Sequence, residues 1–226
     1  MAVLSNIFLF LLLLPYLSPY PVNSDIQPLF VLISIFLLVL KIYQKGKIKF
    51  NRTDFIFLII SLFSILFISL EDTPILKKQL GLLVAFLIYY TYKEYYKYFH
   101  IDTVYFALMT LVFGAIFQYI FPEIFGSFFE NFINHIRYSP EQGRGLTSLT
   151  PEPAFFAASL MVISFILSTE KMKKIEPIGR YYFFQFIIIF FLLMTKSFVS
   201  IIFLVFILFH LFNIKKSLFI IITIFA

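Results

Sequence analysis

The stretch from Arg137 to Leu160 reads RYSPEQGRGLTSLTPEPAFFAASL, and it interrupts an otherwise apolar chain. Its first part, Arg137 to Pro153, holds two arginines, two glutamates, two glycines and three prolines, and the chain is apolar again from Ala154 to Leu160. In a membrane protein, a loop of this kind is either a loose connector or a segment that binds something. The residues considered below favour binding.

The composition predicts an integral membrane protein. Of the 226 residues, 61% are hydrophobic and 13% are charged, whereas soluble domains are about 45–50% apolar and about 25% charged. The chain has no cysteine, which excludes disulfides and thiol chemistry. The formal charge of +6 does not indicate a nucleic-acid partner, because the basic residues lie between apolar runs, where they orient a membrane protein.

The apolar runs predict an all-α fold, a polytopic integral membrane protein with about eight or nine transmembrane helices. A helix needs about 20 mostly apolar residues to cross the hydrocarbon. Residues 2–20 could instead be a signal peptide, but no Lys or Arg precedes them and no small-residue cleavage site is evident. The predicted spans are residues 2–20 with a kink at Pro15, 28–43, 54–70, 80–92, 103–121, 154–168, 181–194, 198–212 and a ninth that begins at 217.

The ninth run supplies only the ten residues 217–226, which is about half of a span. We therefore expect residues 1–226 to form a single transmembrane domain that is the N-terminal portion of a longer one. One long external loop is expected at about residues 123–151. The first part of that loop, 123–136, is rich in Phe and Ile and is expected to lie as an amphipathic helix in the membrane interface.

The basic residues predict the orientation, because short loops rich in Lys and Arg stay in the cytoplasm. Placing the basic loop between Lys41 and Arg52 inside also puts 13 of the 18 basic residues inside. The N-terminus is then cytoplasmic, and the loop that contains Arg144 faces outward. For a bacterial inner (plasma) membrane, the outward side is the periplasm or the cell exterior.

Thr150-Pro151-Glu152-Pro153 predicts the start of a helix. Thr150 can cap the helix, and a proline is tolerated in the first turn. The carboxylate of Glu152 meets the positive end of the helix dipole. Glu152 therefore either supports the helix start only or takes part in chemistry at the outer face.

Two or three cations accompany this carboxylate. The guanidinium of Arg144 suits phosphate oxygens, and Gly143 and Gly145 allow the backbone to approach a ligand closely; the alternatives are a headgroup anchor or a salt bridge to Glu152. Arg137 is a further diphosphate ligand or an interfacial arginine that snorkels. Lys196, between Thr195 and Ser197, is a second cation for a diphosphate or part of a tight turn between two helices.

The other polar residues are assigned no role. His135 on the loop is expected to be solvated, and Gln118, Gln185 and His210 lie within spans and are expected to face other helices. The sequence has no carboxylate pair or His cluster at ligand spacing, so we expect no metal. It also has no glycine-rich phosphate loop.

These motifs resemble those of the O-antigen polymerase and O-antigen ligase superfamily of bacterial membrane proteins. The resemblance covers mainly residues 137–205, and it implies that the chain is the N-terminal part of such a protein. It rests on an Arg-Gly segment, an acidic-Pro helix start and a Thr-x-Ser turn. Here these are Arg144-Gly145-Leu146, Glu152-Pro153 and Thr195-Lys196-Ser197.

The resemblance implies a metal-independent membrane glycosyltransferase without a cofactor. Such an enzyme polymerises or ligates undecaprenyl-diphosphate-linked oligosaccharide repeat units for lipopolysaccharide O-antigen, capsule or exopolysaccharide in the cell envelope. Its partners would be the lipid-linked donor, membrane lipid and a chain-length regulator protein. Arg144, helped by Lys196 and Arg137, would hold the leaving diphosphate. Glu152 would take the proton of the acceptor hydroxyl or orient Arg144 or a sugar.

Two other functions remain open from the sequence. A flippase or other transporter of lipid-linked oligosaccharide should place charged sites or broken helices near the bilayer midplane. The predicted spans are nearly free of ionisable residues, and the polar residues gather at the outer edge, which favours surface chemistry. The third function is that of a non-catalytic assembly subunit, which would bind no polyprenyl diphosphate.

Overall fold

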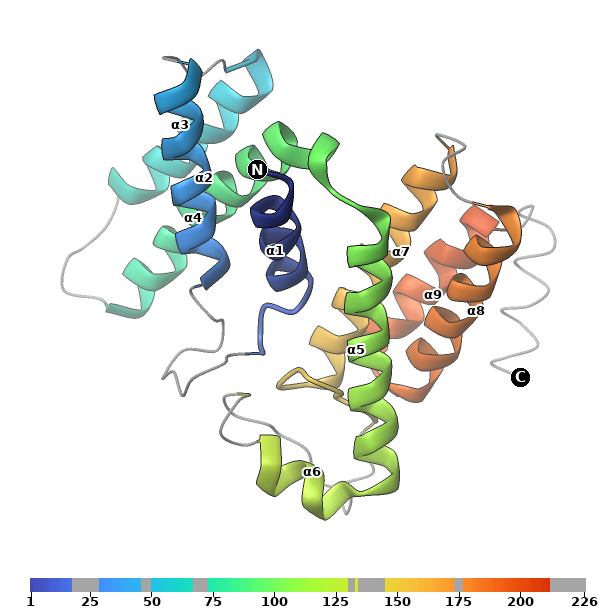
Figure 1. The fold of residues 1–226 in the computed structure, drawn as a ribbon. Helices are drawn as coiled ribbons and strands as arrows, with labels where there is room; N and C mark the ends of the chain where they lie inside the picture. The colour runs from blue at the N-terminus through green and yellow to red at the C-terminus, as the bar shows by residue number, and fades with distance from the viewer. Residues whose placement is uncertain are drawn as a thin grey trace. The chain divides into compact units, whose positions relative to one another are not determined.

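The computed structural model describes residues 1–17, 29–45, 50–66, 73–129, 133, 145–172 and 177–211. Within these ranges the chain is all-helical and has no strand, which confirms the predicted all-α class. The helices, shown in Figure 1, are α1 (Ala2–Leu13), α2 (Leu29–Lys45), α3 (Arg52–Leu66), α4 (Thr73–Tyr95), the 3-10 helix η1 (Tyr96–Tyr98), α5 (Ile101–Ile120), α6 (Pro122–Phe129), α7 (Pro153–Met172), α8 (Ile178–Met194) and α9 (Phe198–Leu211).

Each of the eight runs predicted between residues 2 and 212 overlaps one of these helices. The ninth run, 217–226, lies outside the described residues. The predicted kink at Pro15 is wrong, because α1 already ends at Leu13. Proline disfavours helical backbone at the residue before it, so the helix stops where the sequence suggested a bend. A helix is expected at 123–136, and the structure has the eight-residue α6 there, while 130–132 and 134–136 are not described. The position of this helix in the membrane interface stays a prediction.

The number of membrane crossings stays a prediction. Among the described residues, α5 is the one helix that is both long enough and apolar enough to cross a bilayer. Five further helices are apolar but have 10 to 17 residues in their apolar part.

The residues group into two compact units, each described by itself. Unit 1 comprises Met1–Leu12 and Pro28–His100, and unit 2 comprises Leu13–Gln27 and Ile101–Ala226. In unit 1, α4 packs against both α2 and α3. The hydroxyls of Ser34 and Thr91 lie 2.6 Å apart, and the Tyr95 hydroxyl donates to the Leu37 carbonyl oxygen at 2.7 Å. These bonds join α2 to α4 inside an apolar contact and fix their register.

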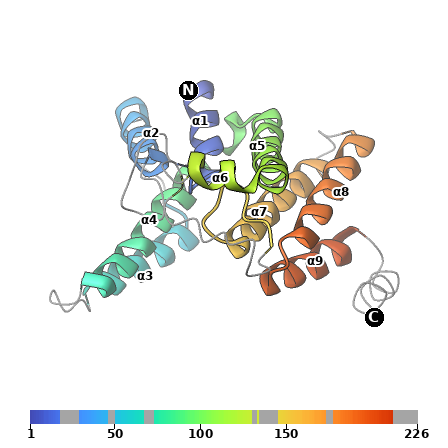
Figure 2. The ribbon, with the colours of Figure 1, turned by 90° about the horizontal axis from the view of Figure 1, so that it is seen from below.

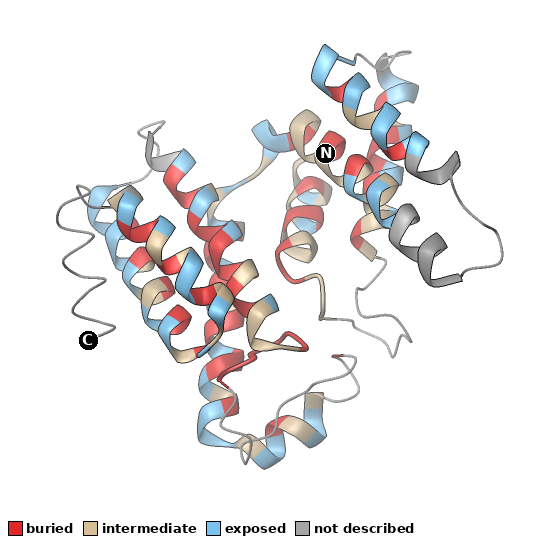
Figure 3. Cartoon of the chain, turned by 180° about the vertical axis from the view of Figure 1, so that it is seen from behind, coloured by how far each residue is buried: buried red, intermediate tan, exposed pale blue. Residues whose placement is uncertain are grey.

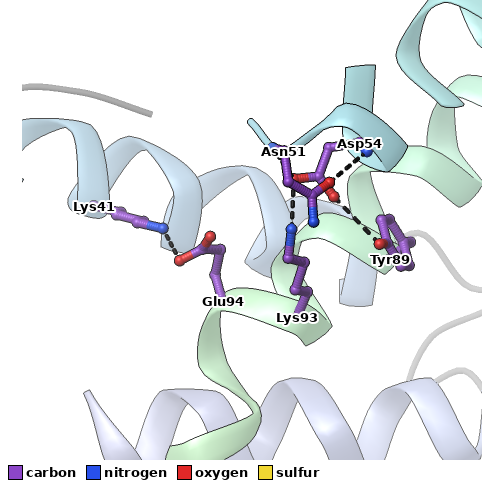
Figure 4. Close-up of polar contacts among 6 residues, drawn as sticks. All are labelled: Lys41, Asn51, Asp54, Tyr89, Lys93 and Glu94. Atoms are coloured by element: carbon purple, nitrogen blue, oxygen red, sulfur yellow. Dashed lines mark hydrogen bonds and ion pairs between the residues drawn. The ribbon is translucent and has the colours of Figure 1, made fainter. Parts of the chain in front are cut away.

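The first turn of α3 is held by a buried carboxylate, shown in Figure 4. Asp54 is 0% exposed, and its Oδ2 accepts the Asn51 N–H at 2.8 Å while its own N–H donates to Asn51 Oδ1 at 2.8 Å. This reciprocal pair is a capping box. Lys93 Nζ lies 2.5 Å from Asp54 Oδ2, and the Tyr89 hydroxyl donates to Oδ1 at 3.2 Å. The start of α3 is therefore tied to the end of α4.

A second ion pair joins the end of α2 to the end of α4. Lys41 Nζ pairs with Glu94 Oε2, although the Lys41 residue is 8% exposed. The ammonium groups of Lys41 and Lys93 lie 5.6 Å and 5.9 Å from the centre of the Tyr90 ring. Both lysines belong to the group predicted to share one side of the membrane, and the structure brings them to one end of unit 1 (Figure 4).

In unit 2, α7 packs against α5, α8 and α9, and α8 packs against α9; Figure 2 shows α7, α8 and α9 together. A buried polar contact lies between α7 and α8. The Ser164 hydroxyl donates to Gln185 Oε1 at 2.7 Å, and Gln185 Nε2 donates to the Ser164 carbonyl oxygen at 3.2 Å. Gln185 therefore faces another helix, as predicted.

The helices of unit 2 have one buried and one exposed side (Figure 3). Small and polar residues are buried among the apolar ones, and the exposed side carries many bulky apolar residues. On α5 the buried side includes Gly114 and Gln118. On its exposed side α5 carries bulky apolar side chains at intervals of three or four residues. These are Phe106, Met109, Phe113, Ile116 and Ile120. On α8, Gln185 is buried, and the exposed side chains include Phe183, Phe186 and Phe190.

We expect Asp54→Ala to lower the free energy of unfolding by about 3 kcal/mol, because it removes the capping box and deprives Lys93 of its carboxylate partner. Asp102→Ala is the matched control. Asp102 also lies in a first helical turn and pairs with Arg180 at 3.0 Å, but its side chain is 77% exposed. Its loss should therefore cost less than about 1 kcal/mol. The measurement is thermal unfolding in detergent, and equal losses would contradict this account of α3.

Candidate functional site

The segment before α7 is the most polar buried part of unit 2. Residues 145–150, called the 145–150 loop below, are all buried. They form the gold segment that lies beside α5 in Figure 1 and is coloured buried in Figure 3. Thr147 and Ser148 are 0% exposed, and Thr150 is 1% exposed. The polar groups of this buried loop must find hydrogen-bond partners inside the protein.

Gln118 of α5 supplies the main partners. Its Oε1 accepts the backbone N–H groups of Thr147 at 3.0 Å and Ser148 at 2.9 Å. Its Nε2 donates to the Thr147 hydroxyl at 2.9 Å. The expectation that Gln118 faces other helices is therefore corrected, because its amide binds the 145–150 loop.

Ser148 and Leu149 pack the same loop against the middle of α5. Ser148 has a φ of 52°, in the left-handed region, and its hydroxyl donates to the Leu111 carbonyl oxygen at 2.5 Å. A Cβ at Gly114 would lie 2.6 Å from Leu149 Cγ and 2.9 Å from Ser148 Oγ. The absence of a side chain at Gly114 is what lets the loop approach the helix this closely.

The other end of the loop contacts the turn between α8 and α9. The N–H of Leu146 donates to the Met194 carbonyl oxygen at 3.1 Å, and a Cβ at Gly145 would overlap the carbonyl of Thr195. Gly145 does permit a close approach, as the sequence predicts. The expectation that the approach is to a ligand is wrong, because the space next to Gly145 is filled by the protein's own backbone.

Lys196 occupies that turn, and its residue is exposed. Its φ of 48° is left-handed, a conformation that glycine usually supplies after a helix C-terminus. The preceding Thr195 is 0% exposed, and its hydroxyl donates to the Leu192 carbonyl oxygen at 2.7 Å. Ser197 then caps α9 by accepting the Val199 N–H at 3.3 Å. The predicted tight turn is confirmed. Lysine occupies a position whose left-handed backbone conformation glycine would adopt with less strain.

Glu152 lies directly before α7, which begins at Pro153. The segment from Thr150 to Pro153 does lead into a helix, but the helix begins two residues later than a cap at Thr150 predicts. The Glu152 carbonyl accepts the N–H groups of Phe155 at 3.1 Å and Phe156 at 3.2 Å, and its residue is half-buried. The capping role expected of Thr150 is wrong. Its hydroxyl lies 2.7 Å from the Thr147 carbonyl oxygen and 2.9 Å from that of Glu152, so it donates to carbonyls instead of accepting from the helix.

The structure brings some predicted site residues together and leaves others undetermined. Gly145, next to Arg144 in the sequence, contacts the turn that carries Lys196. Arg144, Arg137 and His135 themselves lie outside the described residues, as does the side chain of His210. The roles of Arg144, Arg137, Lys196 and Glu152 therefore stay predictions.

Sequence reasoning missed Gln118 and Gly114 as parts of this site. A glutamine near the end of an apolar helix was a usable signal, since a buried amide needs partners. The identity of those partners could not be read from the sequence, because Thr147 lies far along the chain.

No protein-family model, curated protein or solved structure matches the chain. Within the part of the chain that the structure describes, no group of three or more His, Asp or Glu side chains lies close enough to hold a metal ion.

We expect Gly114→Ala to destabilise the protein by about 1–3 kcal/mol, because the added methyl overlaps Leu149 and Ser148. The helix propensity of alanine opposes this change by only about 1 kcal/mol. Gly126→Ala is the matched control. Gly126 also lies within a helix, but nothing lies within 4 Å of a Cβ built there, so the substitution should stabilise. Thermal unfolding of both variants in detergent tests whether the two substitutions change stability in opposite directions. If Gly114→Ala stabilises the protein, the close packing of Leu149 and Ser148 against Gly114 is disproved.

Proposed function

We propose that this protein is a bacterial membrane glycosyltransferase of the O-antigen polymerase or ligase type. It transfers an oligosaccharide from undecaprenyl diphosphate to an acceptor sugar hydroxyl, at the outer face of the inner membrane. One observation carries the proposal. Gly145 of the Arg-Gly motif packs on Thr195 of the Thr-Lys-Ser turn, so two motifs that are distant in sequence lie together within unit 2.

The distribution of residues in unit 2 supports a membrane environment. Soluble monomers rarely expose large continuous apolar surfaces. Here bulky apolar side chains such as Phe113 on α5 and Phe186 on α8 are exposed, while Gln118 and Gln185 of the same helices are buried. Apolar residues on the outside, with small and polar residues at the contacts between helices, is an arrangement that helices adopt in lipid.

The polar groups of the site have chemistry that suits the reaction. The acceptor oxygen attacks the anomeric carbon of the donor sugar while the bond from that carbon to the diphosphate oxygen breaks. The electron pair of the broken bond leaves with undecaprenyl diphosphate, whose growing negative charge is stabilised by Arg144 and Lys196, with Arg137 as a further ligand. The proton of the acceptor hydroxyl passes to the Glu152 carboxylate and then to water.

The buried polar residues of unit 2 favour this function over transport. A transporter of a charged lipid-linked sugar needs ionisable or broken-helix sites within the bilayer. Gln118, Gln185 and Ser164 are buried in the described part of unit 2, are neutral, and bond to other side chains or to backbone. A chain-length regulator protein is the protein partner that this function implies.

We expect Arg144→Lys to reduce polymer formation by at least about 100-fold, because lysine keeps the charge but loses the two-pronged contact with phosphate oxygens. The assay is gel analysis of surface polysaccharide in cells that lack their own copy of the gene and carry the full-length variant. Arg180→Lys is the control, since Arg180 pairs with the exposed Asp102 and should tolerate lysine. Wild-type polymer in the Arg144→Lys strain at equal membrane abundance would remove Arg144 from the mechanism. Unchanged polysaccharide after deletion of the gene would disprove the function itself.

Lys196→Gly separates a structural from a functional role of Lys196. Glycine relieves the left-handed strain at this position, so stability should stay constant or rise by up to about 1 kcal/mol. If the ammonium assists the diphosphate, polymer formation should nevertheless fall by about tenfold or more. Lys196→Arg keeps the charge and should retain most activity. Full activity of the glycine variant would assign Lys196 to the turn alone.

A further inference from the structure

We propose that Gln118 is a positioning residue, whose side-chain amide holds the 145–150 loop against α5 and so fixes Glu152, two residues after the loop, in place for reaction. The catalytic part of this inference rests on the proposed function. The holding of the loop does not, and it can be tested separately.

The geometry of the amide carries the inference. One oxygen of Gln118 accepts two consecutive backbone N–H groups, and its nitrogen donates to the hydroxyl of the first of the two residues. All the participating groups are buried. An amide that lost this arrangement would leave buried donors of Thr147 and Ser148 unsatisfied, which is costly in an apolar setting.

The loop has few ways to keep its position without this amide. Ser148 is held in the left-handed region, which a serine adopts only when its surroundings impose it. Its N–H bonds to Gln118, and its hydroxyl bonds to Leu111 of the same helix. Gly114 supplies the space into which Leu149 fits, but it supplies no hydrogen bond. Gln118 is therefore the polar side chain of α5 that binds the loop backbone.

The position of Gln118 also explains why it should affect chemistry. The loop that it binds begins next to Arg144 and ends two residues before Glu152. The same loop contacts the turn that carries Lys196 through Gly145 and Leu146. A displacement of the loop would move Glu152 relative to Lys196, and small errors in such geometry are costly to rate.

The chain offers a matched control and a conservative variant. Gln185 is the same residue type, is 1% exposed and also bonds to a neighbouring segment, but it joins α7 to α8 and does not touch the loop. Gln118→Glu keeps the shape of the side chain. The protonated carboxyl of this variant can accept the N–H groups of Thr147 and Ser148 and donate to the Thr147 hydroxyl. The leucine of Gln118→Leu can make none of these hydrogen bonds. The side chain of Gln118→Asn is one methylene too short to reach the loop.

The absence of cysteine allows a direct measurement of loop position. Leu149 is 4% exposed, so Leu149→Cys places a single, buried thiol within residues 1–226. Any cysteine beyond residue 226 is replaced by serine for this measurement. In full-length protein reconstituted in lipid nanodiscs, we expect Gln118→Leu to raise the rate at which a maleimide labels this thiol by about tenfold or more. Gln185→Leu should change that rate by less than about twofold, and Gln118→Glu should return it to the starting value. If Gln118→Leu does not accumulate, Gln118→Asn takes its place.

Polymer formation is measured for the same substitutions in chains that keep Leu149. We expect it to fall by about tenfold or more in Gln118→Leu and to recover in Gln118→Glu, with Gln185→Leu close to wild type. Equal maleimide labelling rates in the Gln118→Leu and Gln185→Leu chains would overturn the inference. It would also be overturned if Gln118→Leu is labelled fast but still forms polymer at the wild-type level. If the wild-type protein forms no polymer, the proposed function fails, and the labelling rates alone decide whether Gln118 holds the loop.

Discussion

The need to hydrogen-bond a buried backbone governs the site. A loop with six consecutive buried residues, three of them with hydroxyls, would be unstable against apolar helices without internal partners. Gln118 meets this need by binding two N–H groups and one hydroxyl at once. Gly114 and Gly145 meet the steric requirement, because one leaves room for Leu149 and the other lets the loop contact the turn at Thr195. The loop is thus a packed part of unit 2, which makes it suited to presenting the residues that flank it in a fixed place.

Strain and charge occur together at the turn between α8 and α9. Lys196 adopts a left-handed conformation that glycine would adopt with less strain, and it is exposed, so packing does not explain the side chain. Strained residues of this kind gather at functional sites. In the proposed reaction, the ammonium of Lys196 and the guanidinium of Arg144 act on the same diphosphate. The Gly145 contact supports this pairing, because it joins the neighbours of these two residues.

Unit 1 buries a paired carboxylate, whereas the ion pair described in unit 2, Asp102 with Arg180, is exposed. Asp54 is buried with Lys93, Tyr89 and the Asn51 backbone around it, and Lys41 is paired with Glu94. These contacts join the ends of α2 and α4 to the start of α3, which are consecutive elements. The sequence predicted that Lys41 and Lys93 share a side. It does not reveal their acidic partners, because each lysine pairs with a carboxylate on another helix and the orientation rule uses Lys and Arg alone.

The sequence by itself determined the all-helical class, the position of the helices, the presence of a helix start close to Glu152 and the turn at Lys196. These features follow from local properties, namely the length of apolar runs, the missing N–H of proline and the polar residues between runs. The predictions made from the sequence at Pro15, Thr150 and Gly145 are wrong, because the local rule used at each residue is compatible with two different structures. The tertiary structure alone decided that Gln118 binds Thr147 and that Gly145 fits against Thr195. Both contacts join residues far apart in the chain, and the spacing of residues within one segment contains no information about which distant backbone will fill a gap or satisfy a buried amide.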